Sequence, residues 1–406
     1  MDETAIKSFE TPRKFKFKRY IIYYFFALFL IISTPLSFMG AFNRSTTLLL
    51  ETIGYTMIAV ISLSLVVGFL GELSLGHAGF MSIGAILGMY IQQTLFKGIA
   101  SSAPLLSLIL TMLVGGIIAA FFGFLIGLPA LRLKGDYLAI VTLAFGEIVK
   151  IVIQNIPALG GAIGLSNEFK YDSKTLFLII IFMAFLVLVL VKNLLKSKFG
   201  RNIMSIRDNE IASRAMGINV TFYKLMVFVL SAFLAGVAGV LYGAGKFNIS
   251  SSTFDYNYSI NNILVMVVIG GMGNINGSVI SAIVVTFIDV KLGTSLSGNM
   301  ALIKPIIFAL ILILIVIYNN APGLKNFREK YNFHNLYIFI KKKIKKLIFK
   351  TDELNVDPSV QKDFGADWSK IPTKIEMNTI VTTDLKVDVD PTKPDKGGKK
   401  HEWRDN

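Results

Sequence analysis

Two short stretches of this chain carry ionisable side chains within apolar surroundings. The stretch from Gly71 to Phe80 reads GELSLGHAGF, and it places Glu72 and His77 among three glycines between two long apolar segments. Hydrocarbon offers no water to backbone polar groups, so such a glycine-rich break requires protein or a water-filled cavity around it. Ionisable residues at membrane depth indicate a functional site by default, and close packing of helices at the glycines is the rival interpretation.

The second stretch contains Glu147 and Lys150, which are three residues apart in an apolar segment that begins at Asp136. At this spacing two side chains share one face of a helix and partly neutralise each other. A lone charge at the centre of a bilayer costs several kcal/mol, so this face should look into a helix bundle. The pair is either a polar wall of a translocation path or a buried ion pair that fixes helix packing. Asn261 and Asn262 raise the same question.

The sequence lacks the motifs of a metal site, a thiol site and a nucleotide-binding loop. The three histidines, His77, His334 and His401, have no partners at metal-ligand spacing, and there is no cysteine. No Gly-x-x-x-x-Gly-Lys-Ser/Thr phosphate loop is present, so the chain cannot hydrolyse ATP by that route. We therefore predict no catalytic residue, no metal site and no bound cofactor.

Glycines recur at the small-xxx-small spacing that lets helices approach closely. The pairs are Gly84/Gly88, Gly123/Gly127 and Gly239/Gly243. We interpret them as packing positions.

The composition is that of a polytopic membrane protein. Hydrophobic residues make up 53% of the 406 residues and charged residues 17%, below the roughly 25% charged residues of soluble domains. The net charge is +15, but the cations flank apolar segments. Lipid rather than nucleic acid is therefore the expected partner of these cations.

The chain should fold as an all-α transmembrane helical bundle with about ten spans, within a range of eight to eleven. The apolar segments are 20–39, 48–70, 78–96, 104–127, 137–156, 175–192, 222–245, 258–272, 275–291 and 301–318. The first follows a basic N-terminus, residues 1–19, and is too long for a typical signal peptide. We interpret it as an uncleaved span.

The basic clusters predict the orientation, because loops rich in Lys and Arg face the cytoplasm. Alternating spans from a cytoplasmic N-terminus put Arg132 and Lys134, the segment 192–224 and the lysines of 341–346 on the same side. Both termini are therefore predicted to be cytoplasmic.

The C-terminal part divides in two. Residues 321–350 are basic and carry interleaved aromatic and aliphatic residues, which suits an amphipathic juxtamembrane segment on acidic lipid. Residues 351–406 are polar, contain four prolines and lack the periodicity of a core. We predict a disordered cytoplasmic tail, with a small role in partner binding as the alternative.

The segment 200–219 is not membrane-like. It reads as a short helix with Asp208 as its N-cap, acidic residues in its first turn and Gly217 at its C-terminal end. A helix this short is marginal alone in water, so it should dock against its own bundle or a partner. A solvated linker helix is the alternative.

Five stretches in order resemble the branched-chain amino acid ABC transporter permease family. They are GELSLGHAGFMSIGA (71–85), PALRLKGDYLAIVTLAFGEIVK (129–150), GRNIMSIRDNEIASRAMGIN (200–219), KLMVFVLSAFLAGVAGVLYG (224–243) and VVIGGMGNINGSVISA (267–282). Together they cover most of residues 50–320. The 351–406 tail is beyond what the family leads us to expect.

The resemblance implies a multi-pass permease subunit in a bacterial cell membrane, with residues 20–320 as the permease domain. This subunit would move leucine, isoleucine or valine inward. Its implied partners are a second homologous permease, two cytoplasmic ATPase subunits that bind the ATP, and an extracytoplasmic substrate-binding protein. The permease itself would not be an enzyme.

The resemblance also assigns a coupling loop, residues 193–222, that would fit a groove on the ATPase. Its coupling candidates are Arg207, Asp208, Asn209, Glu210, Ala212, Arg214 and Gly217.

On the predicted topology, the Gly71–Phe80 stretch lies at the cytoplasmic end of the second span, where the chain enters the third. Its glycines, Gly71, Gly76 and Gly79, are then packing and helix-breaking positions. Its polar residues, Glu72, Ser74 and His77, would satisfy backbone groups or neighbouring helices near an inner gate.

Three alternatives remain open at this point. The same machine could carry nucleosides, urea or sugars. A secondary transporter or channel driven by an ion gradient would make Glu147 and Lys150 its coupling residues. A structural scaffold would use the tail as its working part.

Overall fold

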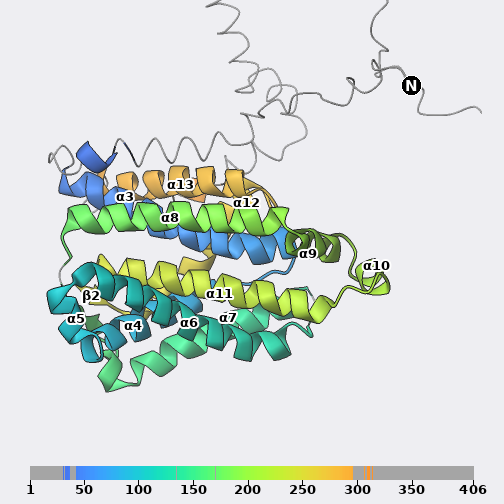
Figure 1. Ribbon diagram of the computed structural model, residues 1–406, viewed down its shortest axis with the longest axis horizontal. Coiled ribbons are helices and arrows are strands. Elements are labelled where there is room, and N and C mark those ends of the chain that lie inside the picture. Colours follow the sequence, from blue (N-terminus) through green and yellow to red (C-terminus); the bar gives the residue numbers. More distant parts are fainter. Residues whose placement is uncertain are drawn as a thin grey trace, which may run out of the picture. The chain divides into compact units, whose positions relative to one another are not determined.

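The computed structural model describes residues 31, 33–36, 43–133, 135–169, 171–295, 306, 309–310 and 313, and it is mostly helical (Figure 1). These residues belong to one compact unit. The predictions for residues 1–19, 321–350 and 351–406 lie outside the described residues. The same holds for nearly all of the first and last predicted spans.

A long helix, α3, continues without a break into a π-helical turn, η1. The first elements are α3 (Arg44–Ser64), the π-helical η1 (Leu65–Leu70), α4 (His77–Thr94), α5 (Lys97–Ser102), α6 (Pro104–Ala130), α7 (Asp136–Gln154), the 3₁₀ turn η2 (Pro157–Leu159) and β1 (Leu165–Ser166). The remaining elements are α8 (Ser173–Lys196), α9 (Lys198–Asp208), α10 (Glu210–Ala215), α11 (Val220–Ala244), β2 (Asn248–Ile249), the 3₁₀ turn η3 (Ser251–Phe254), the π-helical η4 (Tyr258–Leu264), α12 (Val265–Gly270) and α13 (Ile275–Ser295).

Five helices in the described part are long and apolar enough to cross a membrane. They are Arg44–Leu70, Pro104–Ala130, Ser173–Lys196, Val220–Ala244 and Ile275–Gly293. The predicted apolar segments between residues 48 and 291 each coincide with a helix. The mostly helical fold is therefore confirmed, with one small addition: β1 pairs antiparallel with β2, joining Leu165 to Ile249.

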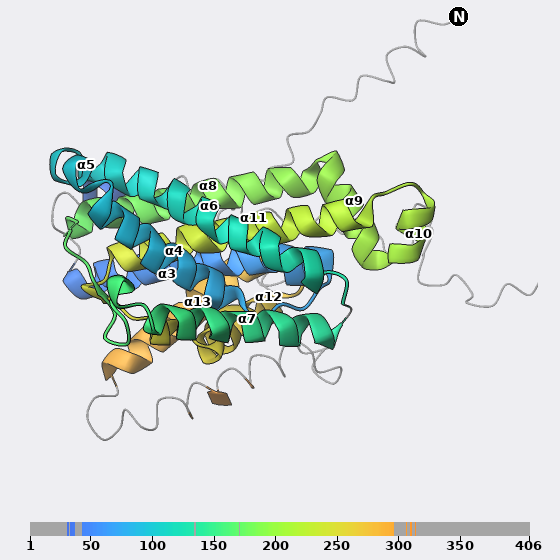
Figure 2. The ribbon, with the colours of Figure 1, turned by 90° about the horizontal axis from the view of Figure 1, so that it is seen from below.

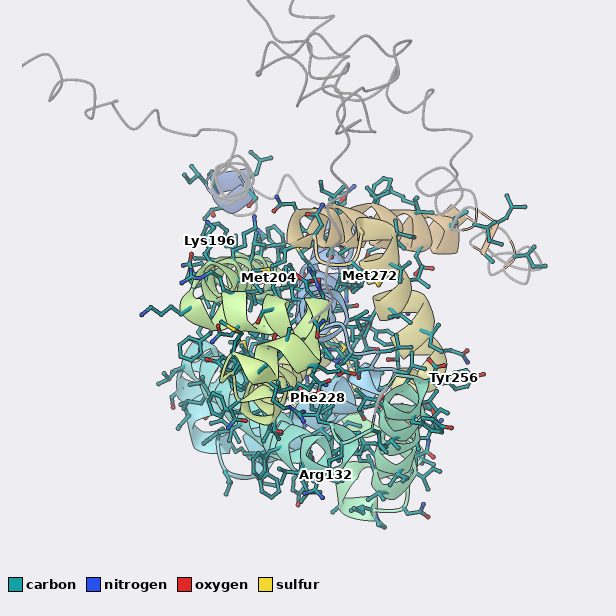
Figure 3. The ribbon with its side chains drawn as sticks, turned by 90° about the vertical axis from the view of Figure 1, so that its right-hand side faces the viewer. Arg132, Lys196, Met204, Phe228, Tyr256 and Met272 are labelled. Carbon is teal, nitrogen blue, oxygen red and sulfur yellow. The ribbon has the colours of Figure 1, made fainter. Side chains whose placement is uncertain are left out.

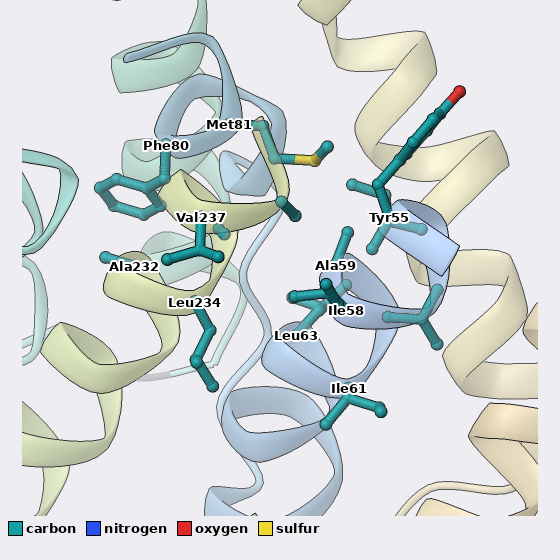
Figure 4. Close-up of a cluster of buried hydrophobic side chains, with 14 of the residues drawn as sticks. Tyr55, Ile58, Ala59, Ile61, Leu63, Phe80, Met81, Ala232, Leu234 and Val237 are labelled. Atoms are coloured by element: carbon teal, nitrogen blue, oxygen red, sulfur yellow. The ribbon is translucent and has the colours of Figure 1, made fainter. Parts of the chain in front are cut away.

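Helix α3 is the centre of the bundle and packs on α8, α11 and α13. Figure 4 shows its side chains Ile58 and Leu63 facing Leu234 and Val237 of α11 and Met81 of α4. These side chains are almost completely buried. Side chains that are buried between helices pack densely against one another, and this packing holds the helices in one arrangement.

Glycines bring α4 and α11 into backbone contact. A Cβ atom at Gly84 would overlap the carbonyl oxygen of Gly236, and one at Gly239 would overlap that of Met81. Gly123, on α6, lies against Ala232 of α11. The three predicted glycine pairs thus lie at helix contacts, and α4, α6 and α11 form one tightly packed group (Figure 2).

The glycine-rich break falls where the sequence predicts it. Helix η1 ends at Gly71, whose φ of 80° is left-handed and suits glycine. Five further residues are non-helical before α4 begins at His77. Gly76 then packs so closely on α7 that a Cβ atom would overlap the Thr142 carbonyl oxygen.

The segment 200–219 differs from the prediction of one short helix capped by Asp208. It contains most of α9, which ends at Asp208, and the separate helix α10, whose N-cap is Asn209. The Asn209 Oδ1 atom accepts a hydrogen bond from the Ala212 N–H at 2.9 Å. The Asp208 carboxylate is instead occupied by Arg207, which donates to it from Nε and Nη2. Gly217 does follow the helix end, with a φ of 81°.

Candidate functional site

A buried lysine ties the glycine-rich break to the segment α9–α10. The Lys224 ammonium, in the first turns of α11, lies 2.5 Å from a carboxylate oxygen of Glu72 and 3.1 Å from one of Glu210. The Lys224 and Glu72 side chains are only 6% and 12% exposed. We call these three residues the Lys224 hub. It joins three parts of the chain that the sequence separates by up to 152 positions.

The hub depends on all its members because its charges are withdrawn from water. Two carboxylates around one ammonium carry one net negative charge, which the exposed Arg214 offsets by pairing with Glu210 at 2.9 Å. Truncating one partner of a buried pair leaves the other charge uncompensated, at a cost of roughly 3–5 kcal/mol. The hub therefore holds α10, α11 and the break in one relative position.

A pocket of about 410 Å³ lies beside the hub. Glu210 and Arg214 line one side of it, Lys224 another, and Gly127 and Arg132 at the end of α6 a third. The pocket thus lies between α10, the start of α11 and the end of α6.

Arg207 makes the second attachment, between α9 and η1. Its Nη1 atom donates to the Gly68 carbonyl oxygen at 3.3 Å, which lies in the π-helical turn before the break. Its Cγ atom would lie 2.7 Å from a Cβ at Gly71, so this glycine makes room for the arginine. Arg207, predicted as a coupling residue, therefore contacts the bundle itself.

Helix α10 and the residue after it expose two large apolar side chains. Ile211 and Met216 are 81% and 82% exposed, and Asn209, Ala212 and Gly217 are exposed beside them. Figure 3 looks onto this end of the bundle, where Arg132 and Lys196 lie around α9 and α10. These two side chains are the large apolar groups that α10 and its C-terminal end expose to a partner.

The remaining residues of the break face inward. His77 is buried, and its Nε2 atom shares a hydrogen bond of 2.6 Å with the Ser62 hydroxyl. Gly79 packs against Gly146 of α7. The buried Ser74 hydroxyl has no hydrogen-bond partner among the described residues, and its role near an inner gate stays a prediction.

Glu147 and Lys150 form an ion pair on α7, as their spacing predicts. Both side chains are partly buried, and the Glu147 carboxylate also accepts the Tyr256 N–H at 3.0 Å. Asn261 and Asn262 lie on η4, and within the described part no hydrogen bond joins Asn262 to the pair. The structure thus brings Glu147 and Lys150 together, and the role of the four residues in a translocation path stays a prediction.

The sequence interpretation missed Lys224, Ile211 and Met216. Lys224 is a lone cation one turn inside an apolar span, which signals a buried partner but does not identify it. Ile211 and Met216 lie in a segment rich in charged residues, and their exposure depends on how α10 packs.

In the described residues, no three His, Asp or Glu side chains gather as metal ligands.

The fold and this site define a helical membrane protein that presents a tethered helical segment at one end of its bundle. The chain belongs to the family described as branched-chain amino acid transport system / permease component, which it matches over residues 45–316.

The chain is similar to named permeases of bacteria and archaea. It is 35% identical over 263 residues to the high-affinity branched-chain amino acid transport system permease protein LivM of Salmonella typhimurium, over 56% of this chain and 60% of that protein. It is 27% identical to the probable LivM of Methanocaldococcus jannaschii, over 61% and 81% of the two chains. It is 27% identical to the nucleoside ABC transporter permease protein NupC of Lactococcus lactis, over 45% and 62%. No solved structure matches the chain.

Proposed function

We propose that this chain is the permease subunit of an ABC importer that moves branched-chain amino acids into the cell. The family supports the class of machine. Two relatives that carry the LivM name support the cargo. The chain spans 60% of the length of the Salmonella protein.

The tethered helix α10 carries this proposal. The exposed apolar side chains of Ile211 and Met216 fit a groove on a soluble partner, and the Lys224 hub links α10 to the membrane-embedded helices. ATP binding can shift a permease only through contacts that differ between its two states. A helix that is anchored by charges beside a pocket provides such contacts.

The proposed partners follow from this arrangement. Two cytoplasmic ATPase subunits would bind the ATP, one of them at α10, and a second homologous permease would complete the path. An extracytoplasmic binding protein would deliver the substrate at the opposite end. In this proposal the chain crosses a bacterial cell membrane about ten times and has both termini in the cytoplasm. Helices α9 and α10 would then lie on the side of the ATPase.

The break and the α7 ion pair have roles in this proposal. Glu72, Ser74 and His77, with Gly71, Gly76 and Gly79, would form an inner gate whose position the hub senses. Glu147 and Lys150 would line the path together with Asn261 and Asn262. A neutral pair in the path avoids the cost of a lone charge at membrane depth.

Transport by purified components tests the proposal. The full-length chain is reconstituted in proteoliposomes with its ATPase, second permease and binding protein, and uptake of radiolabelled leucine is measured with and without ATP. We expect ATP-dependent uptake that unlabelled isoleucine and valine inhibit.

A second cargo has a specific observation in its favour, the similarity to a nucleoside permease. Inhibition of uptake by nucleosides, with no effect of isoleucine or valine, would replace the amino-acid cargo. Uptake that persists without ATP and follows an ion gradient would contradict the ABC machine itself.

A further inference from the structure

A second polar pocket lies at the end of the bundle opposite α9 and α10. It has a volume of about 240 Å³, somewhat below the roughly 300 Å³ at which pockets for drug-sized ligands begin. Its walls come from the start of α3, the start of α8 and the chain just after α11, with Arg44, Glu51, Ser173 and Lys246 as lining residues. The pocket therefore suits a small ligand.

Hydrogen bonds of Asn167, beside the β1–β2 pair, fix two walls of this pocket. The Asn167 N–H donates to the Phe247 carbonyl oxygen at 2.8 Å, next to the paired strands. The Asn167 side-chain amide also donates to the carbonyl oxygens of Gly243 and Lys246, each at 3.3 Å. These bonds hold the residues after α11 against the segment before α8, so the pocket is built into the fold.

Glu51 is the unusual residue of the pocket. It lies two turns inside α3 and is only 4% exposed. One carboxylate oxygen accepts a hydrogen bond from the Ser173 hydroxyl at 3.2 Å. A carboxylate offers roughly four acceptor positions, and among the described residues no cation lies within ion-pair distance of it. A buried carboxylate in a membrane-spanning helix is costly unless it is satisfied.

Two cations complete the charge pattern. Arg44, seven residues before Glu51, shares its helix face two turns away, and Lys246 follows the end of α11. Both act electrostatically on the Glu51 carboxylate without pairing with it directly. The pocket thus contains a buried carboxylate, Glu51, and two cations, Arg44 and Lys246, that do not pair with it. Leu48, Leu176 and Phe247 add apolar side chains to the lining of the pocket.

We propose that this pocket binds the zwitterion of an α-amino acid with an aliphatic side chain. The substrate ammonium would bind Glu51, the substrate carboxylate would bind Arg44 and Lys246, and the side chain would contact Leu48 and Leu176. This inference rests on the proposed function, because the pocket would receive substrate on the side where a binding protein releases it.

The charges of the pocket discriminate against other ligand classes. A plain anion would meet the Glu51 carboxylate, and a plain cation would meet Arg44 and Lys246. A neutral nucleoside would leave all three charges without a counter-charge. A site whose buried polar groups stay unpaired rejects a ligand strongly, so a zwitterion is the small ligand that fits.

Equilibrium binding to the full-length chain in lipid nanodiscs tests the inference. The probes are radiolabelled leucine and two competitors that each lack one charge, 3-methylbutylamine and 4-methylpentanoate. Glu51→Gln should weaken binding of leucine and of the amine about tenfold or more, since a hydrogen bond to a charged group is lost. It should leave binding of 4-methylpentanoate unchanged or stronger.

Lys246→Gln should show the reverse selectivity, weakening leucine and 4-methylpentanoate but not the amine. Glu168→Gln is the matched control, because Glu168 is an exposed carboxylate paired with Lys97, and it should change none of the three affinities. Absence of leucine binding by the unaltered chain, or an equal loss of all three ligands in Glu51→Gln, would overturn the inference.

Uptake by the assembled transporter separates this inference from the proposed function. ATP-driven leucine uptake that Glu51→Gln leaves unchanged, with unchanged leucine binding, would remove the pocket from the path and leave the proposed function standing. Zwitterion-selective binding to the pocket without any ATP-driven leucine uptake would instead contradict the proposed function alone.

Discussion

At the scale of single residues, the glycines decide where helices touch. Gly76 has no room for a side chain, because the Thr142 carbonyl oxygen occupies the position of a Cβ atom. Gly98, at the start of α5, has nothing within 4 Å of that position. The two glycines therefore differ in packing while both lie at or near the start of a helix.

Replacing Gly76 with alanine should destabilise the contact between α4 and α7. The methyl group forces the two backbones apart, and overpacking of this kind costs about 1–3 kcal/mol. The thermal unfolding midpoint of the detergent-solubilised chain measures the effect. Gly98→Ala is the control and should be neutral or slightly stabilising, since alanine favours a helix over glycine. Equal midpoints for Gly76→Ala and Gly98→Ala would contradict the described contact.

Residue types predict helix ends less well than helix interiors. Asp208 and Asn209 are both good N-caps by type, and the sequence does not show which is free. In the structure the Asp208 carboxylate pairs with Arg207, and Asn209 caps α10. The N-cap of the predicted helix thus lies one residue later than predicted, and the residues up to Asp208 form the separate helix α9.

At the scale of elements, ion pairs of similar geometry should differ in their contribution to stability. The Lys224 pair with Glu72 is buried, while the Lys97–Glu168 pair, at 3.1 Å, has side chains that are 66% and 54% exposed. Exposed pairs contribute about 0–1 kcal/mol, because water and salt screen them. Buried pairs cannot lose one partner without leaving a charge in a low dielectric.

Replacing Lys224 with methionine should therefore lower the free energy of unfolding by about 3–5 kcal/mol, and Lys97→Met by about 1 kcal/mol or less. Unfolding of the detergent-solubilised chain in a denaturing detergent measures both. The double variant Lys224→Met with Glu72→Gln should recover part of the loss, because it removes the uncompensated carboxylate. A similar loss for the two lysine variants would mean that the hub does not hold α10 and α11 together.

Hydrophobic patterning predicted the spanning elements well and their contacts in part. The segments 104–127 and 175–192 lie within helices α6 and α8, and 222–245 exceeds α11 by only its last residue, because a helix that crosses lipid needs a long apolar stretch. Small-xxx-small spacings also found the close contacts. The partners of Lys224 could not be found this way, since pairing across 152 positions depends on how the helices assemble. The β1–β2 pair was missed because each strand has only two residues.

At the scale of the whole molecule, the two ends of the bundle have different chemistry. One end carries α9 and α10 with two exposed apolar side chains and an ion-pair hub (Figure 1). The other end carries the β1–β2 pair and the pocket around Glu51. In an importer these ends would meet the ATPase and the binding protein, respectively. We propose that α10 is the part of this chain that a soluble ATPase contacts.

Binding of the ATPase subunit to variants of α10 tests that claim most directly. Ile211→Lys and Met216→Lys place charges on the exposed face without touching the hub, and Ile163→Lys changes an exposed apolar residue in the loop before β1. We expect the two α10 variants, in proteoliposomes, to weaken ATPase binding and reduce ATP-driven leucine uptake by about tenfold or more, as loss of an interface anchor does. Ile163→Lys should keep both near the unaltered level. ATPase binding and uptake that are unchanged in both α10 variants would contradict the account.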